Sequence, residues 1–490
     1  MKNPKNLKGD EYIRDVIKKG DEGSDLLGKL SRKSWDKDYI LQHNCRAYIK
    51  LPENEQAVVV FQLAGPQEET DPRKYTKKTM ERLMQIAKEN DLVPLAIANV
   101  IDSQTGDILM LEDIMNEMLN SGIPIINGEN AILGKERMNH PVSLAITCIA
   151  KPSKNLREGI FRYNGIAFAA FYHRNQLVFA NSDGVGTKTE FYERALELGM
   201  ERTGNALRDS LAMKLDDAAK QCISVMVVCD IVEHTENFNP TNLMSYAKHL
   251  SEKYNFRYLL QCEGSPKFKG YKRGVPAFNV SGSAVGLIPE TYIKKEFVPK
   301  AGDFLIALAG EKPSPRSNGI TAKRKFLIEK YGLDWHLNQE FKERREILEY
   351  LTTPATIFYP LFTYLLKQEI ATAVFHLSGG AYNGKLARPL AKHSLIAVTE
   401  SLFPLSREEL FFLNQDFSEQ NIKNAFAKWP MGAEGFFSTH ELESALEQIN
   451  RFNSGKADKY RAKLAGRIYS PGALLLNPGM GKHPVHFDGS

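Results

Sequence analysis

One order of secondary-structure elements occurs twice in the first 290 residues of the chain. In the first copy, strand patterns over Val58–Thr70 and Pro94–Asp102 alternate with two helical patterns, and a closing strand covers Val142–Ala150. In the second copy the same order extends from Gln176 to Ile288. We interpret the six matched elements as a duplication of one α/β unit. The alternative is that two α/β segments look alike by chance.

After about residue 296 the pattern changes to a separate α/β arrangement with a glycine-rich turn. The last residues are rich in Gly, Pro and His, which favours a loose tail. The predicted parts are an N-terminal extension that is partly helical (1–45), a first repeat (46–155), a second repeat (156–295), a C-terminal domain (296–465) and the tail (466–490).

Composition narrows the classes of function. A net charge of +5 is small for 490 residues and does not indicate nucleic-acid binding. No apolar run approaches the roughly 20 residues that a membrane-spanning helix needs. The five cysteines are scattered without a CxxC pair, which favours a reduced, cytoplasmic setting over zinc or disulfides. We therefore expect a cytoplasmic protein that acts on a small molecule, without nucleic-acid or membrane partners.

The second copy contains the motif DGVGTK, from Asp183 to Lys188. Its glycines allow the backbone to approach a ligand, and successive N–H groups in such a turn attract anions. Its carboxylate suits phosphates only with a cation between them, and Mg²⁺ prefers oxygen ligands. The motif therefore indicates a site for Mg·ATP, although an ordinary surface turn is the alternative. The predicted nucleotide-binding loop comprises Asp183, Gly184, Val185, Gly186, Thr187 and Lys188.

A second acidic pair, Asp216 and Asp217, lies in the predicted helix Ala206–Lys220 that follows this loop. Adjacent acids on a helix usually belong to a solvated face. The alternative is that they reach the same metal as the carboxylate of the loop. Our candidate Mg²⁺ ligands are therefore Asp183, Asp216 and Asp217.

These motifs resemble those of aminoimidazole ribonucleotide (AIR) synthetase, also called phosphoribosylformylglycinamidine cyclo-ligase. In that family a DGVGTK loop precedes a helix with an Asn-Asp pair, and here Asp216 replaces the asparagine while Asp217 is retained. A further family aspartate corresponds to Asp230. SPRSNGIT resembles the family's His-Ser-Asn-Gly turn, with Arg316 in place of the histidine. FHLSGGA resembles its His-Ile-Thr-Gly-Gly-Gly segment, and the resemblance covers about residues 165 to 440.

The resemblance implies an α+β fold in which N-terminal and C-terminal α/β domains are joined. In the family, two N-terminal domains from two subunits close into a barrel. The two tandem repeats here are therefore expected to pair as a pseudo-dimer within one chain, and a homodimer of such chains stays open. The implied activity is the ATP-dependent ring closure of formylglycinamidine ribonucleotide in purine synthesis, with ATP and Mg²⁺ as cofactors. Two serine–glycine turns are the expected substrate site, with Ser317, Asn318, Gly319, Ser378, Gly379 and Gly380.

The two copies complement each other. The family's Gly-Gly-Glu-Thr-Ala-Glu-Met signature matches NGENAILG (Asn127–Gly134) in the first copy better than CEGSPKFKG in the second. The phosphate loop shows the reverse, because the first copy has AGPQEE where the second has DGVGTK. We therefore expect one composite site with Glu129 and Asn130 from the first copy, and catalytic roles for Lys188, Asp217 and Glu129. The opposite site, formed by AGPQEE and CEGSP, would be degenerate. The alternative to a composite site is ordinary sequence drift, with both Gly-Glu segments serving only as turns.

Two other functions stay open. One is a different ATP-dependent reaction within the same superfamily, whose members act on formylglycinamide ribonucleotide, thiamine phosphate, selenide or carbamoyl groups. The other is a nucleotide-binding regulatory homologue that has lost catalysis, which the changes at Arg316 and in the Gly-Glu-Thr signature would suit.

Overall fold

The computed structural model describes residues 18–19, 22–52, 57–154, 156–317, 319–456, 458–470, 474–476 and 485–487. They form two compact units. The first contains the chain up to Glu193 together with Ile223–Lys294, and the second contains Arg194–Cys222 together with the chain from Lys295. The long part of the second unit begins at Lys295, and the predicted C-terminal domain begins at residue 296. The sequence predicts that Arg194–Cys222 belongs to the second repeat. In the structure this segment belongs to the second unit instead.

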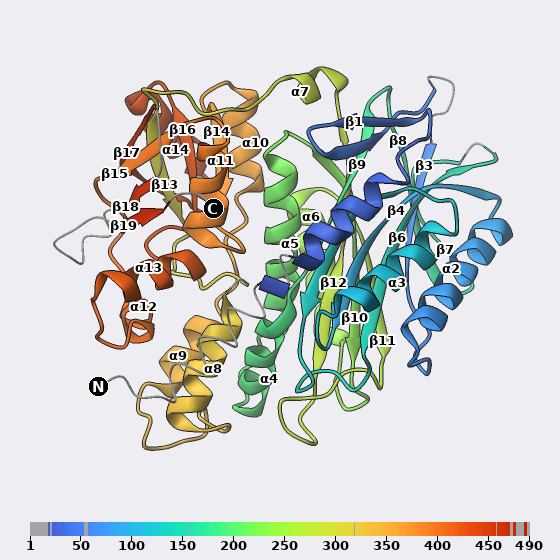
Figure 1. Ribbon diagram of the computed structural model, residues 1–490, viewed down its shortest axis with the longest axis horizontal. Coiled ribbons are helices and arrows are strands. Elements are labelled where there is room, and N and C mark those ends of the chain that lie inside the picture. The colour runs from blue at the N-terminus through green and yellow to red at the C-terminus, as the bar shows by residue number, and fades with distance from the viewer. Residues whose placement is uncertain are drawn as a thin grey trace. The chain divides into compact units, whose positions relative to one another are not determined.

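The first unit contains two six-stranded sheets with the same strand order (Figure 1). The strands of one sheet, in spatial order, are β1 (Ile40–His43), β2 (Arg46–Ile49), β9 (Leu177–Gly184), β12 (Phe278–Ile288), β10 (Ser224–His234) and β11 (Arg257–Gly264). The strands of the other are β7 (Gly159–Tyr163), β8 (Ile166–Tyr172), β3 (Ala57–Ala64), β6 (Val142–Pro152), β4 (Leu92–Ser103) and β5 (Ile125–Ile132). In each sheet the last two strands are parallel and the other neighbours antiparallel. This agreement confirms the predicted duplication.

The two repeats exchange their first hairpins. β1 and β2 precede β3 in the chain, yet β2 pairs with β9 of the second repeat. In the same way β7 and β8 precede β9, yet β8 pairs with β3 of the first repeat. Each sheet is therefore built from both repeats. The predicted boundary at residue 45 separates β1 from β2. The predicted boundary at residue 155 assigns β7 and β8 to the second repeat, although they belong to the sheet that contains β3.

Alternate side chains of β3 reach two different cores. Val58 and Val60 belong to the core between the two sheets, together with Val178 of the facing sheet. Val59 and Phe61 belong to the core on the other side of β3, where helices cover the sheet. A strand with both faces covered is expected to be apolar throughout, and all eight residues of β3 are buried.

Helices cover the outer face of the sheet that contains β3. α2 (Pro72–Glu89) and α3 (Ile108–Leu119) lie side by side there, and the helical residues 22–32 contribute to the same core (Figure 1). α2 begins where the side chain of Asp71 accepts a hydrogen bond from the N–H of Lys74 (2.8 Å). The described part of the predicted extension thus contains a packed helical segment as well as strand β1. The remaining elements of this unit are η1 (Gly186–Lys188), the first turns of α4 (Thr189–Glu197), α6 (Thr241–Tyr254) and α7 (Glu290–Lys294).

Two segments that the sequence analysis interprets as turns are strands in the structure. Asn127–Asn130 lies within β5, and Cys262–Gly264 ends β11. A Cβ atom on Gly128 would lie 2.2 Å from Oδ1 of Asn99, so that any larger residue would displace the Asn99 side chain of β4. Glycine here permits a close approach between strands and does not mark a turn.

The second unit contains one seven-stranded sheet. Its strands, in spatial order, are β14 (Ala373–His376), β16 (Gly435–Thr439), β13 (Phe304–Ala309), β17 (Arg461–Tyr469), β15 (Ile396–Thr399), β18 (Leu474–Leu476) and β19 (Val485–Phe487). The described residues of the predicted tail therefore continue this sheet, and the expectation of a loose tail is wrong for them. The helices of this unit are α5 (Gly204–Ala219), α8 (Ile320–Tyr331), α9 (Arg344–Leu351), α10 (Tyr359–Lys367), the π-helical turn η2 (Asn383–Ala387), α11 (Arg388–Ala391), α12 (Arg407–Phe412), α13 (Glu419–Lys428) and α14 (Leu442–Asn453).

Candidate functional site

The Asp183–Lys188 loop connects the end of β9 to α4 through the single turn η1. Of its two glycines only Gly186 has a positive φ, +62°, a backbone conformation that residues other than glycine rarely adopt. The N–H of Val185 donates to the carbonyl of Val280 in β12 (2.9 Å), which ties the loop to its own sheet. The loop thus has a fixed backbone that leads into a helix N-terminus, an arrangement suited to anions.

Strand β5 of the first repeat runs beside this loop. The N–H of Ser182 donates to Oδ1 of Asn127 (2.8 Å), and Leu133 lies 3.7 Å from the Cβ position that Gly186 lacks. Because side chains alternate along a strand, Glu129 lies on the same face of β5 as Asn127 and Leu133. Glu129 is thus on the face of β5 that lies beside the loop in the first unit, and its part in a composite site stays a prediction.

Asn130 belongs to the opposite face of β5. Its Nδ2 atom lies 2.8 Å from a Cβ built on Gly23, and Leu111 lines the same space. Asn130 is only 5% exposed, and neither polar atom of its amide has a hydrogen-bond partner among the described residues. Its position does not fit the predicted contact with a nucleotide on the loop side of β5.

Two buried carboxylates lie near the loop. Asp102 of β4 accepts a hydrogen bond from Nδ2 of Asn279 (2.8 Å), and Glu233 of β10 accepts one from the hydroxyl of Ser143. The strand registers make Asp102 and Glu233 equivalent positions in the two repeats. Burial, followed by the charges of Glu233 and Asp183, raises the pKa of Asp102 to about 7. The sequence analysis missed this pair, because a single acid in an apolar strand forms no motif.

The other two motifs, AGPQEE of the first repeat and CEGSP of the second, also lie together, but their side chains form hydrogen bonds with each other. Gln67, in the AGPQEE segment, donates to Glu263 (3.0 Å). The fully buried Lys267 donates to the hydroxyl of Tyr75 (2.8 Å) and to the carbonyl of Gly65 (3.4 Å). Its ammonium group lies 4.4 Å from the centre of the Tyr75 ring. Protein side chains thus fill the place that faces the degenerate loop.

The strand registers also correct two of our alignments. Leu63 of β3 is the residue equivalent to Asp183 of β9. Gln261 of β11, and not Glu263, is equivalent to Glu129 of β5. The first repeat therefore lacks the carboxylate of the loop, and the second lacks the carboxylate of the facing strand.

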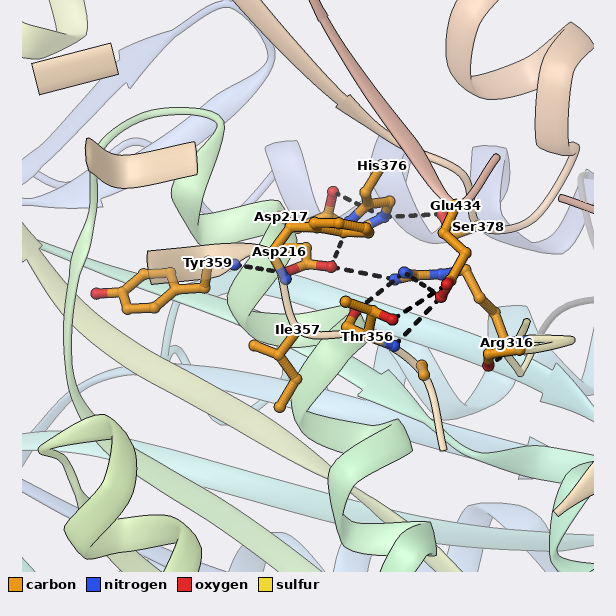
Figure 2. Close-up of polar contacts among 12 residues, drawn as sticks. Asp216, Asp217, Arg316, Thr356, Ile357, Tyr359, His376, Ser378 and Glu434 are labelled. Carbon is orange, nitrogen blue, oxygen red and sulfur yellow. Dashed lines mark hydrogen bonds and ion pairs between the residues drawn. The ribbon is translucent and has the colours of Figure 1, made fainter. Parts of the chain in front are cut away.

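In the second unit, Asp216 of α5 lies at the centre of a polar cluster (Figure 2). Its carboxylate accepts hydrogen bonds from the N–H groups of Phe358 and Tyr359 (2.7 and 2.8 Å) and from Arg316 (3.1 Å). Because α10 begins at Tyr359, the carboxylate caps that helix from outside. Asp216 is fully buried and both of its oxygens are used. This environment does not fit the predicted role of Asp216 as a Mg²⁺ ligand.

Arg316 connects Asp216 to a second buried carboxylate. Its guanidinium donates to the carbonyl of Thr356 (3.1 Å) and lies 3.9 Å from Glu434 (Figure 2). Glu434 in turn accepts hydrogen bonds from the N–H of Gly310 (3.0 Å) and the hydroxyl of Thr356 (3.1 Å). The two residues that depart from the family pattern, Asp216 and Arg316, are thus direct partners. Their opposite charges are a sequence signal that could have predicted this contact.

Asp217 is partly exposed, with 32% of its side chain accessible, and lies 2.5 Å from Nζ of Lys220. Burial alone would raise the pKa of Asp217, but Lys220 and Lys385 hold it well below its usual range. His376 is buried beside it and forms a hydrogen bond with the hydroxyl of Ser378 (2.9 Å). Burial, followed by the charge of Lys220, lowers the pKa of His376 well below its usual value, so that its ring is neutral at pH 7. Asp217 is therefore the ionised member of this pair.

The expected substrate site consists of two turns of the second unit. Ser378 is buried in the polar cluster, while residues 379–380 are exposed. Ser317 follows Arg316, and its hydroxyl is buried without a hydrogen-bond partner among the described residues. Gly319 has φ +70° at the start of α8, and Asn318 lies outside the described residues. An unmet hydroxyl in a turn suits a polar ligand.

In the described ranges no three His, Cys, Asp or Glu side chains gather into a group that could hold a metal ion. Asp183 and Asp217 belong to different units, so their shared role in Mg²⁺ binding stays a prediction. The part of the chain that the structure covers also contains no helix with the length and apolarity needed to cross a membrane.

No family model matches the sequence. The chain is similar to the phosphoribosylformylglycinamidine cyclo-ligase of Gloeothece citriformis (strain PCC 7424), with 22% identity over 59% of this chain and 81% of the relative. It is 24% identical to that of Bacillus pumilus (strain SAFR-032), over 60% of this chain and 81% of the relative. Among solved structures, the thiamine monophosphate kinase of Aquifex aeolicus aligns with a TM-score of 0.37 and 15% identity, over 66% of this chain and 91% of that chain.

Proposed function

We propose that this chain is an ATP-dependent cyclo-ligase of the AIR synthetase superfamily, which closes the imidazole ring of formylglycinamidine ribonucleotide. Its curated relatives are cyclo-ligases by name. The observation that carries the proposal is the contact of β5 in the first repeat with β9 and the Asp183–Lys188 loop of the second, through Asn127 and Leu133. Alternation along β5 puts Glu129 on the same face of that strand. DGVGTK of the second repeat and NGENAILG of the first, each a weak motif by itself, thus lie beside each other in the first unit.

The residues at this place fit Mg·ATP. The N–H groups of the loop and the buried ammonium of Lys188 would hold phosphate oxygens, while Asp183 would hold Mg²⁺. Mg²⁺ supplies neutralisation of the charge that develops on the transferred phosphoryl group. Glu129, on the face of β5 beside the loop, would orient the bound Mg·ATP. Thr187, which is nearly buried, adds a hydroxyl donor at the start of α4.

In the proposed reaction, ATP activates the amide oxygen of the substrate, and a nitrogen of the same substrate attacks the activated carbon. Ring closure releases ADP and phosphate. Catalysis then depends on positioning and charge neutralisation more than on covalent chemistry. We propose that Ser317 and Ser378, with the glycines beside them, bind the substrate, and that Asp217 acts as an ionised group near it.

A second candidate is a different ATP-dependent reaction of the same superfamily. The pair of Asp216 and Arg316 favours it, because a buried ion pair stands where the resemblance predicts an asparagine and a histidine. Such a replacement changes the donors and acceptors offered by the turn before Ser317. A changed substrate would then be accepted while the nucleotide site stayed the same.

The decisive experiment is an ATPase assay with and without formylglycinamidine ribonucleotide, accompanied by detection of the aminoimidazole product. We expect ATP hydrolysis that requires this substrate and one ring closed per ADP. Asp183→Asn and Lys188→Ala should each weaken nucleotide binding by about tenfold or more without unfolding the protein. Substrate-independent hydrolysis or no product would reject the cyclo-ligase, and unchanged ATP affinity in both variants would reject the nucleotide site.

A further inference from the structure

Arg137 lies in the connection between β5 and β6, on the first repeat, and reaches into the second. It is 3% exposed, and its guanidinium holds both carboxylate oxygens of Glu193 at 2.5 Å. Glu193 is fully buried in α4, the helix that follows the Asp183–Lys188 loop. Paired N–H donors on one carboxylate fix both distance and orientation, which a lysine cannot do.

The same guanidinium is linked to the loop itself. Nη2 of Arg137 donates to the hydroxyl of Thr189 (3.1 Å), the first residue of α4. The hydroxyl of Thr189 donates in turn to the carbonyl of Gly186 (3.0 Å). Gly186 is the residue of the loop with positive φ, so this chain of hydrogen bonds ends where the backbone conformation is most specific.

Pseudo-symmetry gives Arg137 a counterpart in the degenerate half. Met138 and Phe268 form an antiparallel bridge. On either side of it, the N–H of Asn139 donates to the carbonyl of Lys267 (2.7 Å), and the N–H of Lys269 donates to the carbonyl of Arg137 (3.1 Å). This reciprocal pairing makes Lys267 the equivalent of Arg137. Each repeat therefore sends one buried cation across to the loop of the other.

The two cations do different things at equivalent places. Lys267 contacts its loop directly, through the carbonyl of Gly65, and packs on Tyr75. Arg137 is instead held on α4 by Glu193 and reaches its loop only through Thr189. Lys267 thus occupies the degenerate loop. Arg137 instead supports the backbone of the intact loop through the hydroxyl of Thr189.

We propose that Arg137 is a positioning residue for nucleotide binding, through which the first repeat sets the Asp183–Lys188 loop of the second. The proposal rests on the proposed function, because it assigns the loop to Mg·ATP. Arg137 does not itself contact the nucleotide. Its effect passes through Thr189 and Gly186.

The test measures Mg·ATP affinity by calorimetry for the full chain, alongside the midpoint of urea unfolding. Thr189→Val keeps the ion pair of Arg137 and Glu193 but removes the link to Gly186. It should weaken Mg·ATP binding about fivefold to tenfold, since both hydrogen bonds of the Thr189 hydroxyl are lost, with a smaller change in the unfolding midpoint than Lys267→Met causes. Arg137→Lys keeps the charge but not the paired contacts, and should weaken binding at least as much. In turnover assays both should raise the KM for ATP and leave the KM for the second substrate unchanged.

Lys267→Met is the matched control at the equivalent position. It should lower the unfolding midpoint without changing Mg·ATP affinity, because its loop binds no nucleotide. The inference is overturned if Thr189→Val and Arg137→Lys keep the parent's Mg·ATP affinity within twofold while only stability changes. It is also overturned if Lys267→Met weakens binding as much as they do. A parent protein that binds no Mg·ATP overturns the proposed function together with this inference.

Discussion

Asp216 and Arg316 are the two single residues that depart most clearly from the AIR synthetase pattern, and they form one buried ion pair. A buried carboxylate and a buried guanidinium offset each other's desolvation only while both are present. Either change alone would leave an uncompensated charge in the cluster of Figure 2. The two departures are therefore one coupled replacement, and neither alone indicates loss of function.

This coupling can be measured with a double-mutant cycle. Asp216→Asn should lower the free energy of unfolding, by less than the roughly 3–5 kcal/mol of a wholly unpaired buried charge, because Arg316 keeps Glu434 3.9 Å away. Arg316→His should also destabilise, whereas the double variant should lose clearly less than the sum of the two. Urea unfolding of the four proteins gives the coupling energy, expected to exceed about 1 kcal/mol. Losses that simply add would show that the two positions act independently.

Asp102 should make stability depend on pH. Its pKa in the folded chain is about 7, above the usual value near 3.8, so the folded state holds a proton that the unfolded state has lost. The stabilisation that it contributes is complete below about pH 4 and disappears as the pH rises through 7. At pH 8 the ionised form costs on the order of 4 kcal/mol.

Asp102→Asn removes that cost and keeps a polar partner for Asn279. We expect the variant to be more stable than the parent at pH 8, with a difference that shrinks steadily toward pH 5. Urea unfolding across this range checks the sign. A variant that is less stable at every pH would mean that the carboxylate itself is needed for the fold.

At the scale of elements, local patterns predicted the duplication because each strand and helix has its own periodicity. The exchange of hairpins was not predictable in this way, since the contact of Ile49 with Val178 depends on pairing between distant segments. Asn127–Asn130, the middle of β5, is predicted to be a turn because Gly128 and its polar neighbours are typical of turns. The actual requirement is the closeness of Asn99. α5 was assigned to the second repeat, but 12 of its residues are buried, which requires cover on more than one face.

β5 also provides the clearest test of the composite site. Glu129→Gln keeps the shape of the side chain and removes the charge that faces the Asp183–Lys188 loop. Turnover should fall by roughly tenfold to a hundredfold, as expected when a charged contact in a phosphate site is lost. The matched control is Gln261→Ala at the equivalent position of β11, which should leave turnover near that of the parent. Equal losses from the two changes would contradict an asymmetric pair of sites.

At the scale of the whole molecule, the first unit has the strand order of two paired subunits but only one intact loop. Leu63 stands where Asp183 stands in the other half, and Gln261 stands where Glu129 does. The degenerate place is also closed by Lys267 and its ring contact with Tyr75. Duplication within one chain allows this division, because the two halves can change separately. Identical subunits cannot do so.

One chain should therefore bind one nucleotide, whether or not chains associate. Calorimetric titration of the full chain with Mg·ATP should give a stoichiometry of one per chain, and Asp183→Asn should weaken binding at that one site by about tenfold or more without exposing a second site. A second site would need a nucleotide to displace the buried Lys267, which would leave the nearby carboxylate of Glu233 without its cation. That loss costs several kcal/mol, more than a new phosphate contact at a loop that lacks the aspartate and the lysine of DGVGTK would return. Two equivalent nucleotides per chain would show that the degenerate half still opens, and the asymmetry derived from strand register would then have no functional meaning.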